Sequence, residues 1–309
     1  MVTALIITRA VHIATSILIT GIFTFDLVML GLTGPSESDE SHEIGRRLFH
    51  LAVCSLIVAL LSAVIWFWLE VASMSGLPVK NTFSASGWGT VLLETQFGRV
   101  WQLRLGLIAT AFVLVASVLA QIKARRALVA VLWLVSVVLL TSLAWISHAA
   151  AATVHPFGVS GDMLHLCAAG FWIGGLVPLT IFLARVRASF SLGETVVRVV
   201  RRFSTLSLCC VTVLIVTGIS NSWLLVGSLH ALFTTPYGRL LLLKLTLFGI
   251  LIGFGARNRF LVKARLRKGS ANPDLLSQLR RNVLCEVCLG VAVVLIVACL
   301  GATPPAWHP

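Results

Sequence analysis

The chain has 309 residues, of which 58% are apolar and 11% are charged. A soluble protein of this length has too little interior to bury so much apolar surface. The composition therefore excludes a soluble globular protein and predicts a polytopic membrane protein. The net charge of +13 does not indicate nucleic acid as a partner, because the basic residues are concentrated in short segments between apolar runs.

Eight apolar runs are long enough to cross a bilayer, which takes about 20 residues in a helix. They are residues 4–32, 48–74, 99–121, 127–151, 160–183, 203–229, 237–257 and 282–302. No separate cleavable signal precedes the first run, so we expect it to remain as a helix. The predicted fold class is an all-α, polytopic membrane bundle of eight transmembrane helices.

The connections between these runs alternate in charge. Those near residues 46–47, 123–126, 185–202 and 257–281 hold 18 of the 24 Lys and Arg residues. Under the positive-inside rule these connections face the cytoplasm, which puts both termini and the "HAAAATVHPFG" loop on the outer side. We expect a multi-pass protein of a bacterial inner membrane with both termini in the periplasm.

The two halves of the chain resemble each other. The segment "TQFGRVWQLRLGL" matches "TPYGRLLLLKLTL", and the spans before them also align. Matched pairs include Arg104 with Lys244, His12 with His165, Gly21 with Gly174, and Arg46, Arg47, Leu51, Cys54 and Trp68 with Arg201, Arg202, Leu206, Cys209 and Trp223. We predict two parallel four-helix repeats, residues 1–152 and 153–309, related by a pseudo-two-fold axis along the membrane normal. This axis allows His12 and His165 to face each other.

Histidines gather toward the predicted outer side. That side holds His12, His148, His155, His165, His230 and His308, whereas the inner side holds His42 and His50. Ionisable groups inside a membrane are costly unless they face the bundle interior and have partners, so we expect His12, His148 and His165 to form a metal site near the outer face. The alternative is that each imidazole hydrogen-bonds to a neighbouring backbone carbonyl and serves packing alone.

Residues near His165 supply further candidates for the site. Asp162 lies three residues earlier on the same helix face, where it can orient the imidazole, bind metal itself, or cap the helix N-terminus. Met163 offers a thioether, or fills space. The predicted supporting residues are Trp172, as a floor for the site, and Gly170, Gly174 and Gly175, as a notch for close helix packing.

Polar residues in other spans extend the set. Lys244, like Arg104, either reaches the lipid interface or belongs to a polar pathway, and Asn221 lies in a polar break that lines a path or bonds between helices. On the inner side, the possible exit residues are Asp26, His50, Cys54 and Glu286. The simpler account is that Asp26 and Glu286 pair with the basic connections.

The segments "HLCAAGFWIGGLVPL", "RRFSTLS", "VTGISNSWLL", "TPYGRLLLLKL" and "LRRNVLCEV" resemble the copper resistance D family, the CopD or PcoD type of inner-membrane protein. The resemblance implies copper handling beside a periplasmic copper-binding partner of the CopC type, with copper moving toward the cytoplasm. The family motif carries over His165, Trp172, Gly174, Gly175, Pro178, Tyr237, Gly238 and Lys244, without deciding which of them bind the ion. Imidazoles suit Cu(II) and thioethers suit Cu(I), so either copper ion is chemically acceptable. Zinc is equally acceptable, and the identity of the metal rests on the resemblance.

The predicted function is copper transport or carriage within the membrane, without catalytic turnover. Expected partners are membrane lipid and the periplasmic copper carrier, and nucleic acid is not expected. One alternative is a membrane oxidoreductase in which the same histidines bind b-type haem, although a relay across the bilayer needs histidines in both leaflets and the inner half offers only His50 within a span. Another is a scaffold that merely docks the carrier.

Overall fold

The computed structural model describes residues 1–30, 39–76, 82, 87–120, 125–147, 155–189, 193–266 and 273–305. Within these ranges there is no strand, and eight helices are long and apolar enough to cross a membrane. The predicted all-α bundle of eight membrane-spanning helices is therefore confirmed.

Ten α-helices and two irregular helical segments make up these ranges. They are α1 (Val2–Thr24) with η1 (Phe25–Leu30), α2 (Asp39–Ser75), α3 (Gly87–Glu94), α4 (Gln96–Leu119), α5 (Arg125–Thr141) with η3 (Ser142–Ile146), α6 (His155–Ser189), α7 (Gly193–Val226), α8 (Leu229–Thr234), α9 (Pro236–Leu266) and α10 (Pro273–Leu300). The short helices α3 and α8 were not predicted, because each is too brief to span a membrane and lies in a connection between two spans.

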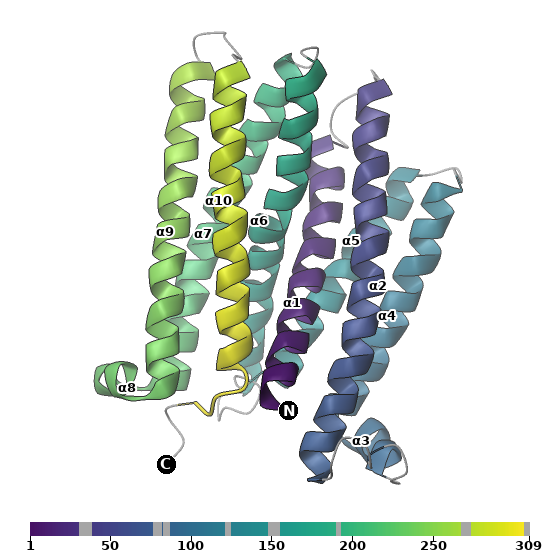
Figure 1. The fold of residues 1–309 in the computed structure, drawn as a ribbon, viewed down its shortest axis with the longest axis vertical. Helices are drawn as coiled ribbons and strands as arrows, with labels where there is room; N and C mark the ends of the chain where they lie inside the picture. Colours follow the sequence, from purple (N-terminus) through teal and green to yellow (C-terminus); the bar gives the residue numbers. More distant parts are fainter. Residues whose placement is uncertain are drawn as a thin grey trace.

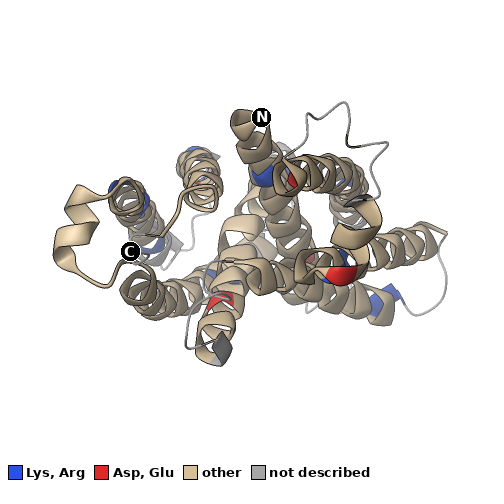
Figure 2. Cartoon of the chain, turned by 90° about the horizontal axis from the view of Figure 1, so that it is seen from below, with Lys and Arg blue, Asp and Glu red and all other residues tan. Residues whose placement is uncertain are grey.

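Helices α1 and α6 stand in the middle of the bundle (Figure 1). On one side of them are α7, α9 and α10, with α8 at their end, and on the other side are α2, α4 and α5, with α3 at their end. Both termini lie at the end that carries α3 and α8, which we call the termini end. Seen from this end, Lys, Arg, Asp and Glu form only isolated stretches of the ribbon (Figure 2).

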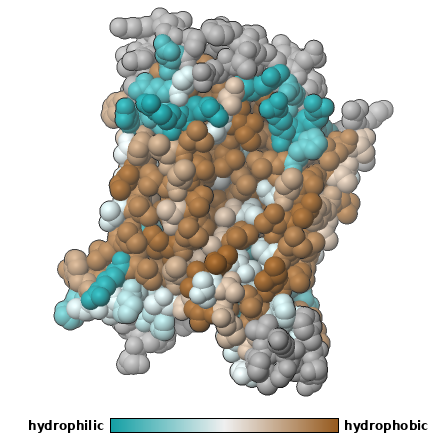
Figure 3. Space-filling model, viewed as in Figure 1, coloured by the Kyte–Doolittle hydropathy of each residue, from teal (hydrophilic) through white to brown (hydrophobic). Residues whose placement is uncertain are grey.

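The opposite end, which we call the basic end, carries arginines at the starts or ends of its helices. They are Arg46, Arg47, Arg125, Arg126, Arg201, Arg202, Arg257 and Arg281. Figure 3 shows hydrophilic surface along this end and a broad hydrophobic belt below it. Large apolar side chains such as Leu61, Ile219 and Trp223 are more than half exposed. An apolar surface of this extent is typical of a lipid-facing bundle.

The central helices α1 and α6 touch through their backbones. A Cβ atom on Gly21 would lie 2.0 Å from the carbonyl carbon of Gly174, and one on Gly174 would lie 2.1 Å from the oxygen of Ile17. No side chain fits at either position, so the two helices pack as closely as small residues allow. Gly21 and Gly174 are the glycines that the sequence pairs between the halves, and they meet where the halves join.

Candidate functional site

His12 on α1 is fully buried and both of its ring nitrogens are bonded within the protein. Its Nδ1 lies 2.9 Å from Ser62 Oγ and 3.1 Å from the Ala59 carbonyl oxygen, and its Nε2 accepts a hydrogen bond from Arg104 Nη2 at 2.6 Å. Arginine has no acceptor, so Nε2 is the unprotonated nitrogen and Nδ1 carries the proton. The lone pair that would bind a metal ion is thus occupied by the guanidinium of Arg104.

Arg104 on α4 is also fully buried, and neutral groups satisfy its donors. Besides His12, it donates to the Leu139 carbonyl oxygen at 2.5 Å, to Ser142 Oγ at 2.6 Å and to Ser16 Oγ at 3.1 Å. A buried cation is tolerated only with such complete hydrogen bonding. Arg104 therefore does not reach the lipid interface, which was one of its two predicted roles.

Aromatic rings fill the space around His12. The ring centroids of Trp66 and Trp101 lie 5.6 Å and 5.5 Å from that of His12, and they lie 4.9 Å from each other. Phe97 stacks on Trp101 with centroids 4.6 Å apart. These rings pack around the buried histidine and arginine.

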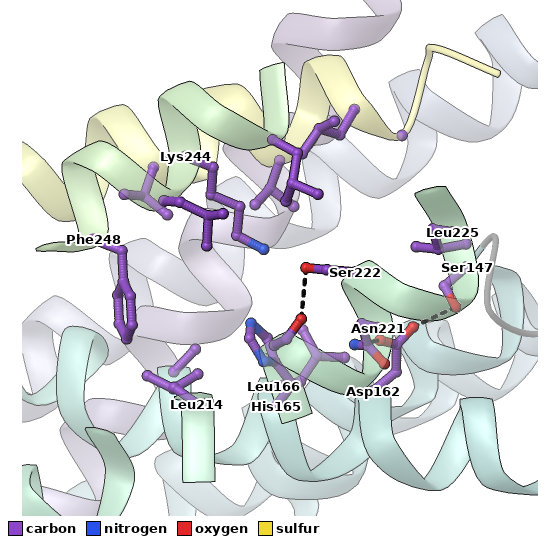
Figure 4. Close-up of a pocket in the computed structure, with 18 of the residues that line it drawn as sticks. Ser147, Asp162, His165, Leu166, Leu214, Asn221, Ser222, Leu225, Lys244 and Phe248 are labelled. Carbon is purple, nitrogen blue, oxygen red and sulfur yellow. Dashed lines mark hydrogen bonds between the residues drawn. The ribbon is translucent and has the colours of Figure 1, made fainter. Parts of the chain in front are cut away.

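His165 on α6 has a corresponding partner but an open surrounding. Its Nδ1 lies 2.9 Å from Thr217 Oγ1, and Thr217 matches Ser62 by the spacing that pairs Cys54 with Cys209. Among the described residues, its Nε2 has no hydrogen-bond partner. His165 lines a cavity of about 920 Å³ between the halves toward the termini end, and the amine of Lys244 points into it (Figure 4).

The surroundings of His12 and His165 differ at two matched positions. The position that matches Trp66 is Asn221, and the position that matches Trp101 is Leu241. Both residues line the cavity. Where the first half has two indoles, the second half has a short amide and an aliphatic side chain, and space remains open beside His165. Both differences can be read from the aligned segments of the two halves.

Polar groups converge on the cavity from α6, α7 and α9. Asp162 accepts hydrogen bonds from Ser147 Oγ and from Asn221 Nδ2, both at 2.5 Å, and it interacts electrostatically with Lys244. Asn221 Oδ1 is buried and has no hydrogen-bond partner within the described part of the chain. Buried acceptors in proteins are usually hydrogen-bonded, so this oxygen is a candidate contact for a ligand, ion or water. Asp162 lies two turns inside α6, so it does not cap the helix.

The remaining candidates near this end lie apart from the cavity or outside the described residues. Met163 does not line the cavity, and Trp172 lies beneath it, packed edge-on against Phe248 with centroids 6.3 Å apart. His148 and His308, and the side chain of His155, lie outside the described residues. Among those that are described, no three His, Cys, Asp or Glu residues lie close enough to hold a metal ion together.

Comparison with known proteins identifies the family. Residues 1–155 match the family model "Copper resistance protein D-like, N-terminal domain", and residues 197–300 match "Copper resistance protein D". The chain belongs to the copper resistance protein D family. The resemblance predicted from its motifs is confirmed.

Three relatives of the family are similar along most of this chain. "Copper transport protein CutJ" of Bacillus subtilis (strain 168) is 30% identical over 259 residues, which is 78% of this chain but 45% of CutJ. "Copper resistance protein D" of Pseudomonas syringae pv. tomato is 26% identical over 296 residues, or 91% and 92% of the two chains. "Inner membrane protein YebZ" of Escherichia coli (strain K12) is 26% identical over 266 residues, or 85% and 87%. No solved structure matches.

The family and the eight spans make this chain a multi-pass inner-membrane protein of copper homeostasis.

At the basic end of this family member, Asp26 on η1 is 3% exposed and Arg125 Nη2 donates to its two carboxylate oxygens at 3.2 Å and 3.1 Å. The predicted pairing of Asp26 with a basic connection is confirmed. His50 is exposed and its Nδ1 lies 2.7 Å from the Arg46 carbonyl oxygen of its own helix, and Cys54 is also exposed.

Glu286 on α10 differs from Asp26. It is 2% exposed, and its Oε1 accepts a hydrogen bond from Asn258 Nδ2 at 2.5 Å. Among the described residues its partner is this amide of α9 and not a basic side chain, and the predicted pairing of Glu286 with a basic connection stays a prediction. Since Asp26, His50 and Glu286 each have different partners, the structure does not join the predicted exit residues into one site.

Proposed function

We propose that this chain carries copper through the inner membrane without catalytic turnover, and that the cavity beside His165 holds the ion. The observation that carries the proposal is the convergence on one cavity of the Asp162 carboxylate with two atoms that have no partner among the described residues, the His165 Nε2 and the Asn221 oxygen. The printed names of two relatives, a copper transport protein and a copper resistance protein, supply the identity of the cargo.

The donors favour the oxidised copper ion in this cavity. Imidazole nitrogen and carboxylate oxygen suit Cu(II), whereas Cu(I) prefers thiolate or thioether sulfur. No Cys or Met is among the described residues that line the cavity. His148 follows Ser147, which lines the cavity, and remains a predicted further ligand. In the absence of copper, Lys244 balances the charge of Asp162.

We also propose that the halves are two copies of one four-helix unit, and that only the second copy binds copper. Matched residues make matched bonds: the histidine to hydroxyl distance is 2.9 Å in each half. Thr95 and Thr235 each accept from the backbone N–H three residues later, at 3.0 Å. In the first copy, Arg104 takes the position next to the imidazole that copper takes in the second.

The orientation of the chain in the membrane follows from the charge distribution. Under the positive-inside rule the basic end faces the cytoplasm, so the termini end and its cavity face the periplasm. There the cavity is placed to receive copper from a periplasmic copper-binding protein of the CopC type. Copper then moves toward the cytoplasm.

Restoring the missing indole should block the cavity. We expect Leu241→Trp to reduce copper accumulation in proteoliposomes at least about tenfold, because an indole in the cavity excludes the ion from His165. The matched control is Leu243→Trp, since Leu243 is on the same helix but about half exposed on the apolar surface. Copper accumulation by Leu241→Trp at the wild-type rate would contradict the proposal, provided that both variants are monodisperse.

The alternative function is that of a membrane oxidoreductase in which the same histidines bind haem. A haem held between His12 and His165 requires His12 to release Arg104, its 2.6 Å donor. An absorption spectrum of the purified protein separates the two functions, because bound haem gives a strong Soret band and copper does not.

A further inference from the structure

Three polar side chains form a buried cluster between α9 and α10, nearer to the basic end than the cavity. Asn258, Asn282 and Glu286 are 8%, 4% and 2% exposed. Asn282 Nδ2 donates to Asn258 Oδ1 at 2.7 Å, and Asn258 Nδ2 donates to Glu286 Oε1 at 2.5 Å. None of the three lines the copper cavity. The proposed copper site therefore leaves this cluster without a role.

Glu286 has no cationic partner within the described part of the chain. Its one hydrogen-bond donor is the neutral amide of Asn258, although Arg281 is only five residues away on the same helix. Asp26 at the same end shows the contrast, because it is equally buried but bonded to Arg125. An ionised carboxylate in an apolar interior is very costly unless a cation or metal compensates it. A carboxylic acid that keeps its proton avoids this cost.

A short series of contacts leads from the second oxygen of Glu286 to the copper cavity. A Cβ atom on Gly255 would lie 3.9 Å from Glu286 Oε2 and 3.7 Å from Trp172 Cζ2, so both groups flank this glycine of α9. Trp172 in turn packs on Phe248, which lines the cavity. In the proposed orientation, the Glu286 carboxyl group thus lies on the cytoplasmic side of Trp172, and the cavity lies on the periplasmic side of Trp172.

We propose that Glu286 is a proton-binding site within the membrane, held by the Asn258 and Asn282 amides and separated from the copper cavity by Trp172. Its ligand is a proton, which resides on Oε2 and exchanges with solvent at the basic end. A proton acceptor beside the transport path allows copper movement to be linked to proton movement. Only this link rests on the proposed function, and the proton site itself does not depend on it. Among the described residues, the carboxyl group contacts the Asn258 amide, which Asn282 holds in turn, and Gly255 separates it from the Trp172 indole. None of these groups titrates near neutral pH.

Infrared spectroscopy of the purified full-length chain at neutral pH tests the site without copper. We expect a carbonyl stretching band of a protonated carboxylic acid that shifts in deuterated buffer and is lost in Glu286→Gln. Asp26→Asn should keep the band, because both carboxylate oxygens of Asp26 accept from the Arg125 guanidinium, which favours the ionised form. Absence of the band from the wild-type protein, or its persistence in Glu286→Gln, would overturn the proposal.

Chemical labelling gives a second measurement that needs no variant to fold. The O–H of a protonated carboxyl group adds across a C=N bond of dicyclohexylcarbodiimide, and rearrangement leaves a stable N-acylurea. Mass spectrometry of the wild-type protein should find this adduct on the peptide containing Glu286 and not on the one containing Asp26. The reverse distribution would count against a protonated Glu286. Since neither measurement involves copper, failure here leaves the copper proposal intact.

Discussion

His165→Ala should lower the affinity of the purified protein for copper by at least about 100-fold, because it removes the imidazole whose Nε2 faces the cavity. Removing a residue that only hydrogen-bonds to a metal ligand lowers metal affinity by up to about 100-fold. Removing a direct ligand should lower it by at least as much. Copper titration in detergent or nanodiscs, with metal analysis of the dialysed sample, measures the effect. The fold should be retained, since a partly buried side chain beside an open cavity leaves little new void.

His12→Ala is the matched comparison, because sequence alone treats the two histidines as equivalents. Removing His12 leaves the buried Arg104 guanidinium without its 2.6 Å acceptor, and we expect this to cost about 3 kcal/mol of stability. Copper affinity should stay within about threefold of wild type, since His12 does not line the cavity and Trp66 and Trp101 pack against its ring. Equal losses of copper affinity in both variants would instead favour a site shared by the two histidines.

Gly174→Leu should separate the halves of the bundle. Because even a Cβ at this position would lie 2.1 Å from the Ile17 carbonyl oxygen, backbone atoms of α1 must move, and flexible side chains cannot absorb the clash. We expect destabilisation of about 3 kcal/mol or more. Size-exclusion chromatography and thermal denaturation in detergent would show aggregation or a much lower Tm.

Gly253→Leu is the control for this substitution. Gly253 is an exposed glycine of α9 with no atom within 4 Å of an added Cβ, so a leucine there faces lipid. Its Tm should match that of the wild-type protein. If Gly174→Leu also retained the wild-type Tm, the central contact between α1 and α6 would not be as close as described.

Much of the fold could be predicted because a bilayer imposes simple rules. Apolar length locates the eight spans, and the pairing of Gly21 with Gly174 comes from matching the two halves. The interior helices depart from regular geometry where the sequence gives little sign of it. One example is η1, which carries Asp26 toward Arg125, and another is η3, which ends the fourth span.

The candidate site could be predicted only in part, because residue identity does not show which lone pairs are free. His12 and His165 occupy matching positions when the two halves are aligned, yet the Arg104 guanidinium occupies Nε2 of His12 alone. Deciding between them requires knowing that Arg104 turns inward and that Trp66 and Trp101 fill the first copy. Those facts depend on packing between helices far apart in the chain. Asn258 was missed altogether, because a single amide near a basic connection resembles an ordinary interfacial residue.

The central claim is that His165 is the open, copper-binding histidine and His12 the sealed one. Modification of the wild-type protein by diethyl pyrocarbonate, which reacts with accessible neutral imidazoles, reads both histidines in one sample by mass spectrometry. We predict that His165 is modified without copper and protected when copper is bound, and that His12 is unmodified in both states. Copper-dependent protection of His12, or modification of His165 that copper does not change, would contradict the account.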